Sequence, residues 1–263
     1  MPAPAESLYR KTYITAGAGM PGASEDPVAY VTAQLIGGGA RPAPWDLPLK
    51  LGRMGFSGWS PEAVAFFQDL QTDNTKAYWS AHKDFYEASV REPMAELLDE
   101  LSGEFGPGRI ARPYRDIRFR ADKSPYKTEI YATLDRGGYV RFGADGLTAA
   151  LGYYMMTAAQ LERYRQAVID DAHGARLAEL TERLRADGLQ VGGGQMLKTA
   201  PRGYPGDHAR IGLLRCKGLI CWRQWPVAPW LYTAGAKDRV VGFLRTAAPL
   251  QQWLDQRVGP APA

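Results

Sequence analysis

The sequence contains few of the residues that build metal centres, disulfide frameworks or membrane spans. It has two cysteines and three histidines in 263 residues, and no apolar run of membrane-spanning length. The histidines lie far apart, and neither a C-x-x-C nor an H-E-x-x-H spacing occurs. The start of the chain shows no secretory signal. We therefore expect a cytoplasmic protein with reduced thiols, no metal site and no membrane contact.

Sequence motifs of nucleotide-dependent and serine-dependent enzymes are also missing. No G-x-x-x-x-G-K-[ST] phosphate loop occurs, and Gly192–Gly194 does not form a G-x-G-x-x-G fingerprint. The GFSGW stretch lacks the spacing of a G-x-S-x-G nucleophile elbow. The sequence therefore names no cofactor and no reaction, and whether the protein is an enzyme stays open.

Residues 1–53 differ in composition from the rest of the chain. They are rich in glycine, proline and alanine, as in PAPA, AGAGMPGA and IGGGA, and show no sustained helical or strand period. We expect a disordered leader or a wrongly assigned start there, with a functional N-terminal segment as the alternative. Residues 54–263 are expected to form a single α+β domain.

Within residues 54–263, helix patterns come first and strand patterns follow. Ser60 and Pro61 are typical of a helix start, and Pro93 is expected to break or restart a second helix that begins near Asn74 or Thr75. Alternation predicts a β-hairpin with strands at 114–120 and 126–134, then two strands around a GADG turn. Further helices are expected over 158–171, 174–188, 207–217 and 236–247, with a strand over 218–225. This order predicts an α+β fold, in which an antiparallel hairpin or meander sheet packs with N-terminal, middle and C-terminal helices.

The run RPYRDIRFRADKSPYK, residues 112–127, concentrates positive charge. It holds six basic and two acidic residues, a local charge of +4 that equals the net charge of the whole chain. Arginine forks bind carboxylate and phosphate oxygens in bidentate fashion. Paired strands would set these cations close together, which favours either an anion site or pairing with the acids. For an anion site the expected ligands are Arg115, Arg118, Lys123 and Lys127, with Asp116 and Asp122 in acid/base roles.

A second basic run covers residues 198–217. It has five basic residues against one acid, Asp207, and includes the turn sequence RGYPGDH. Glycine and proline fix the backbone of such a turn. Arg202 is a candidate anion ligand, and His208 is a candidate acid/base group because Asp207 adjoins it. A helix-capping or surface role for the Asp207–His208 pair is the alternative.

Both basic runs carry a family resemblance. Together with the stretch from FSGW to REPM, they resemble the bacterial domain-of-unknown-function family catalogued under the number 2461, over about residues 56–257. The matching motif is R-D-x-R-F-x-x-D-K-S-P-Y-K-T, which here runs from Arg115 to Thr128. The second element matches at Pro201–Tyr204 and at Asp207 with His208, although Ala209 stands where the family often has proline. The resemblance implies an α+β domain and no particular activity.

Three functions fit these observations. The first is an enzyme or binding protein for a phosphorylated or carboxylated small molecule, with a basic, aromatic-lined pocket where the hairpin and the RGYPGDH turn meet. The second is a nucleic-acid-binding module, since interleaved Arg, Lys, Tyr and Trp suit backbone contact and base stacking. The third is a structural or interaction domain whose charges pair internally. The sequence leaves the ligand and the oligomeric state open.

Overall fold

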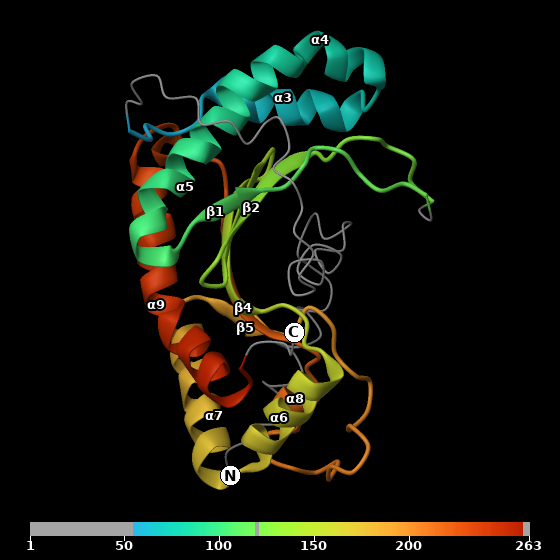
Figure 1. Cartoon of the computed structure of the whole chain (residues 1–263), viewed down its shortest axis with the longest axis vertical. Helices are drawn as coiled ribbons and strands as arrows, with labels where there is room; N and C mark the ends of the chain where they lie inside the picture. Colours follow the sequence, from blue (N-terminus) through green and yellow to red (C-terminus); the bar gives the residue numbers. More distant parts are fainter. Residues whose placement is uncertain (1–54, 119–120, 260–263) are drawn as a thin grey trace, which may run out of the picture. The chain divides into compact units, whose positions relative to one another are not determined.

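The computed structural model describes residues 55–118 and 121–259. The expected leader at residues 1–53 lies outside the described residues. Within the described ranges, no helix combines the length and the apolar composition that crossing a membrane requires. The fold is α+β, as the sequence predicted, with helices and a six-stranded sheet in the order β1-β2-β3-β4-β6-β5 (Figure 1).

The helices and strands have the following bounds. The helices are α3 (Pro61–Thr72), α4 (Lys76–Tyr86), the π-helix η2 (Glu87–Arg91), α5 (Glu92–Phe105), α6 (Ala158–Ile169), α7 (Asp171–Ala186), α8 (Ile211–Leu214), the short 3₁₀ helix η3 (Pro229–Tyr232) and α9 (Gly235–Arg257). The strands are β1 (Gly108–Ile110), β2 (Glu129–Leu134), β3 (Gly138–Gly143), β4 (Gly146–Tyr153), β5 (Gln190–Gly192) and β6 (Leu219–Trp225).

The described residues divide into two compact units. Residues 55–118, 121–150 and 223–246 belong to one, and residues 151–222 and 247–259 to the other. The first contains the segment 111–128 that links β1 to β2, here called the arm, and is called the arm unit. The second contains residues 198–210, here called the basic loop, and is called the loop unit.

Aromatic packing forms the core of the arm unit. Trp59 stacks on Phe142 of β3 at 4.4 Å between ring centroids, and Phe67 of α3 meets the same ring edge-on at 5.8 Å. All three side chains are buried. The predicted start of α3 is confirmed, because Ser60 Oγ accepts a hydrogen bond from the main-chain N–H of Ala63 and Pro61 opens the helix.

Pro93 restarts the helix, as one of the two predicted alternatives, and does not end it. The chain passes from α4 through η2 into α5, with Pro93 in the first turn of α5. A proline in that turn withholds a main-chain donor from the preceding turn. Nearby, the buried indole of Trp59 donates its N–H to the carbonyl of Val90 in η2, at 3.2 Å. The missing donor of Pro93 and the indole bond of Trp59 therefore both fall on the turn in which the helix adopts its wider π geometry.

The predicted strand at 114–120 does not form over its described residues, 114–118. In the described part of the arm, strand-like pairing is limited to an isolated bridge between Tyr114 and Tyr126. Regular pairing resumes with β2, which runs antiparallel to β1 and β3. Residues 112–118 are exposed or half-buried in strict alternation, so their alternating polarity reflects an extended chain beside solvent. The strands around the GADG turn are confirmed as β3 and β4.

In the loop unit, two helix boundaries differ from expectation. Asp207 does not cap a helix, since α8 is a single turn that begins at Ile211 without a side-chain cap. Helix α9 continues through Pro249, before which it was expected to end. The predicted stop of α7 is confirmed, because Gly188 adopts a φ of 79° just after the helix. Such a left-handed conformation is easy only for glycine.

Candidate anion-binding site

The arm leaves β1, extends away from the sheet and returns as β2 (Figure 1, green). Main-chain bonds hold its two sides together near the sheet. The N–H of Arg115 bonds the carbonyl of Pro125 at 2.9 Å, and the N–H of Lys127 bonds that of Pro113 at 2.8 Å. These bonds flank the Tyr114–Tyr126 bridge, so the two sides of the arm keep a fixed register there.

Asn74, between α3 and α4, anchors the returning side of the arm. Its amide Nδ2 donates to the carbonyl of Tyr126, and its Oδ1 accepts from the N–H of Tyr126, both at 3.0 Å. One side chain thus satisfies both main-chain groups of a buried residue, as a neighbouring strand would. No local pattern indicates this role, because Asn74 and Tyr126 are 52 residues apart.

The aromatic side chains of Trp79, Tyr114 and Tyr126 pack together and support the arm. Trp79 of α4 stacks on Tyr126 with ring centroids 4.5 Å apart and an interplanar angle of 9°. Tyr114 lies against both rings, 5.5 Å from Tyr126 and 6.3 Å from Trp79. Trp79 and Tyr126 are buried, whereas Tyr114 keeps 49% of its surface exposed.

An ion pair between Arg115 and Asp122 connects the two sides of the arm. Arg115 Nη1 donates to Asp122 Oδ2 at 2.6 Å. Asp122 Oδ1 also accepts from the hydroxyl and the main-chain N–H of Ser124, at 2.6 and 2.9 Å. The bonds from Ser124, and then that from Arg115, hold the pKa of Asp122 well below its usual range. The carboxylate therefore stays charged near neutral pH and orients both partners.

Asp116 orients Arg118 at the surface of the arm. Nε and Nη2 of Arg118 donate to the two carboxylate oxygens of Asp116 at 3.0 and 2.6 Å. The Arg118 side chain is 76% exposed. These bonds, together with the one from the Arg118 main chain, lower the pKa of Asp116 to about 2. A group of such low pKa is a poor proton acceptor near neutrality, so Asp116 is better suited to holding Arg118 in place.

The two lysines of the motif contact main-chain carbonyls. Exposed Lys123 donates from Nζ to the carbonyl of Ile117 at 2.9 Å. Lys127 is buried and donates to the carbonyl of Arg112 at 2.8 Å and to the hydroxyl of Tyr131 at 3.2 Å. Its ammonium also lies 4.5 Å from the centroid of the Tyr131 ring. Lys127 therefore fixes the base of the arm, whereas Lys123 and Arg118 present their charge to solvent.

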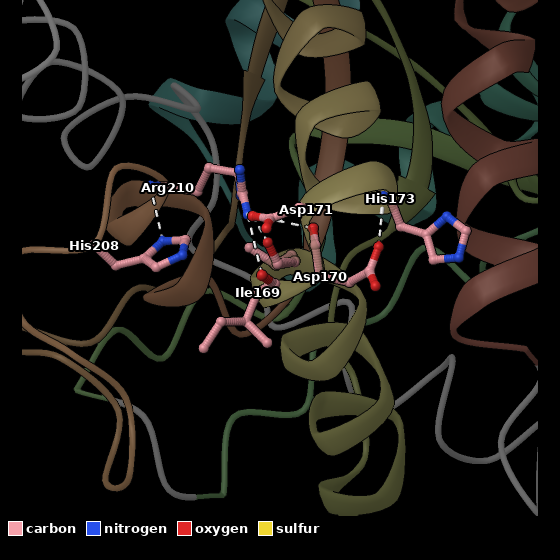
Figure 2. Close-up of polar contacts among 7 residues, drawn as sticks. Ile169, Asp170, Asp171, His173, His208 and Arg210 are labelled. Carbon is pink, nitrogen blue, oxygen red and sulfur yellow. Dashed lines mark hydrogen bonds and ion pairs between the residues drawn. The ribbon is translucent and has the colours of Figure 1, made fainter.

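The remaining predicted site residues lie in the loop unit. Arg202 is exposed in the basic loop. His208 is half-buried and accepts a hydrogen bond at Nδ1 from the main-chain N–H of Arg210, at 3.0 Å (Figure 2). This bond places the proton of a neutral His208 ring on Nε2. Among the described residues His208 bonds Arg210 and not Asp207, and a single pocket joining this loop to the arm residues stays a prediction.

Arg210, which the sequence did not single out, joins the basic loop to the α6–α7 junction (Figure 2). Its guanidinium donates to the carbonyls of Val168, Ile169 and Asp170 at 2.8, 3.1 and 3.3 Å. A cation there also suits the negative end of the α6 dipole. Gly174 makes room for it, since a Cβ at that position would stand 2.6 Å from Arg210 Nε and 2.0 Å from the Val168 carbonyl oxygen.

The fold and the arm define an α+β protein with an extended basic segment between two neighbouring strands. Residues 62–253 match the family described as conserved hypothetical protein (DUF2461), so the chain belongs to that family. This confirms the resemblance in the sequence. No curated protein and no solved structure matches the chain.

Proposed function

We propose that this protein binds a small anionic molecule through phosphate or carboxylate oxygens at the arm. Arg118 carries the proposal. Its guanidinium is exposed and held in one orientation by Asp116, and the bonds to Asp116 use Nε and Nη2. Arginine has further N–H donors on Nη1, in a planar arrangement that matches phosphate and carboxylate. An incoming anion therefore meets an oriented donor.

The neighbouring cations have two different roles in this proposal. Lys123 is exposed and adds charge close to the anion. Arg115 and Lys127 have little exposed side chain and position the arm through Asp122 and the Arg112 carbonyl. The acid/base roles predicted for Asp116, Asp122 and His208 stay predictions. The proposal covers binding and names no reaction.

A phosphate titration of the melting temperature tests the proposal. At constant ionic strength, phosphate should raise the melting temperature in a saturable way, because a ligand that binds only the folded state stabilises it by RT ln(1 + [L]/Kd). Arg118→Gln should remove most of this rise. Arg183→Gln is the matched control, because Arg183 is also exposed and paired with a carboxylate, on α7 of the loop unit.

Two results would overturn the proposal. One is the absence of any saturable shift in the parent protein, and the other is a full shift in Arg118→Gln. Either would favour the interpretation in which the charges of the arm serve only to pair with one another. Arg202→Gln, tested in parallel, reports whether the basic loop takes part.

A further inference from the structure

Tyr114 is unusual among the described residues because its large ring is half exposed. Of the large hydrophobic side chains in the described ranges, Tyr114 and Val227 are exposed, at 49% and 37%. A single exposed apolar side chain needs no functional explanation. Tyr114, however, differs from Val227 in being held by other aromatic rings and in lying between exposed arginines.

The orientation of the Tyr114 ring is fixed before any ligand binds. Trp79 and Tyr126 support it from the protein side, and Asn74 holds Tyr126 by two main-chain bonds. Main-chain bonds on either side of Tyr114 fix its backbone. A ring that is already ordered loses little conformational entropy when a second ring stacks on it, which favours binding.

Exposed cations flank this ring along the chain. Arg112 precedes Tyr114 by two residues and Arg118 follows it by four, and both are exposed. In an extended chain, which rises about 3.3 Å per residue, these α-carbons lie within about 7 and 13 Å of that of Tyr114. An aromatic ring between two arginines matches a ligand in which a flat base is joined to phosphates.

We infer that the anion bound by the arm carries a nucleobase, which stacks on Tyr114 while its phosphates contact Arg112 and Arg118. The inference rests on the proposed function and narrows it from anions in general to nucleotides. The same chemistry is offered by a free nucleotide and by single-stranded nucleic acid. Tyr114 is a specificity-determining residue on this view, because simple anions do not use it.

Calorimetric titration with three probes tests the inference. The probes are inorganic tripolyphosphate, adenosine triphosphate and a ten-residue oligothymidylate. Tyr114→Ser should weaken the binding of the two base-containing probes by roughly 5- to 150-fold, the range expected for one stacked base. The substitution should leave the affinity for tripolyphosphate unchanged. Tyr114→Phe keeps the ring and should bind all three probes as the parent does.

The outcomes separate the two proposals. If the parent binds none of the probes, both fail. If the parent binds all three and Tyr114→Ser binds them equally well, the nucleobase inference fails and anion binding stands. If Tyr114→Ser loses affinity only for the two base-containing probes, a comparison of the oligothymidylate with adenosine triphosphate shows which source of the nucleobase the arm prefers. A single strand is indicated if the oligothymidylate binds more tightly than adenosine triphosphate and its slope of log affinity against log salt is about −1.4 to −2.8, as expected for two to four phosphate contacts. Equal binding of the two probes indicates a nucleotide.

Discussion

Asn74 pairs with the main chain of Tyr126 through both ends of its amide, with Nδ2–O and N–Oδ1 distances of 3.0 Å. Asn74→Ala removes both partners of a buried residue. Each unsatisfied group costs about 1–3 kcal/mol, so the free energy of unfolding should fall by at least that amount in denaturant titration. Asn74→Asp keeps the acceptor and loses the donor, so its loss should be smaller. Equal stability of the parent and Asn74→Ala would show that the anchor is not needed.

Gly174 and Gly103 provide a matched pair of helical glycines. An alanine Cβ at 174 would meet the Val168 carbonyl oxygen and Arg210 Nε, whereas at 103 it would meet nothing within 4 Å. Gly174→Ala should therefore destabilise the protein by about 1–3 kcal/mol, as overpacking does. Gly103→Ala should stabilise it by up to about 1 kcal/mol through higher helix propensity. Thermal unfolding followed by circular dichroism measures both, and a change of the same sign in both variants would contradict the account.

Lys127 and Arg118 should respond differently when their charges are removed. Lys127→Met leaves the Arg112 carbonyl and the Tyr131 hydroxyl without this donor. We expect a loss of about 1–3 kcal/mol in the free energy of unfolding. Arg118→Gln changes a solvent-exposed pair and should leave the melting temperature unchanged in the absence of ligand. A loss for Arg118→Gln as large as that for Lys127→Met would mean that both cations are structural.

Both cysteines should be unreactive in the folded protein. Burial raises the pKa of Cys216 and of Cys221 to about 12, from 9.0. Because the neutral thiol is favoured in the folded state, this contribution to stability is complete below pH 9 and is lost as the pH rises from 9 toward 12. Iodoacetamide at pH 8.5 should label neither thiol in native protein and both in guanidinium. Rapid labelling of the native protein would show that the thiols are accessible.

Local signals predicted helix boundaries where the partners are neighbours in sequence. Ser60 caps the main chain three residues later, and Gly188 lies two residues beyond the end of α7. The boundaries of α8 and α9 were predicted wrongly. Helix α8 begins at Ile211 and not at Asp207, and α9 continues through Pro249, before which it was expected to end.

For the site, the sequence identified the charged residues but not what orients them. The motif placed Arg115, Asp116, Arg118 and Asp122 in one segment, and the structure pairs them within it. Asn74 and Arg210 were missed because their partners lie 52 and about 40 residues away. The alternation in 114–120 predicted a strand, since polarity alone does not distinguish a paired strand from an extended segment.

The pairing of β1 with β2 has a consequence for how the arm can be engineered. Ile110 faces Ala132 in the sheet, and the N–H of Ala111 bonds the carbonyl of Tyr131 at 2.9 Å. Both ends of the arm are thus closed together by the sheet itself. Doubling the length of such a loop adds only about 0.6 kcal/mol of closure entropy. The length of the arm is therefore a weak constraint on the sheet, and the strands that carry the arm can keep their register when its sequence is altered by design.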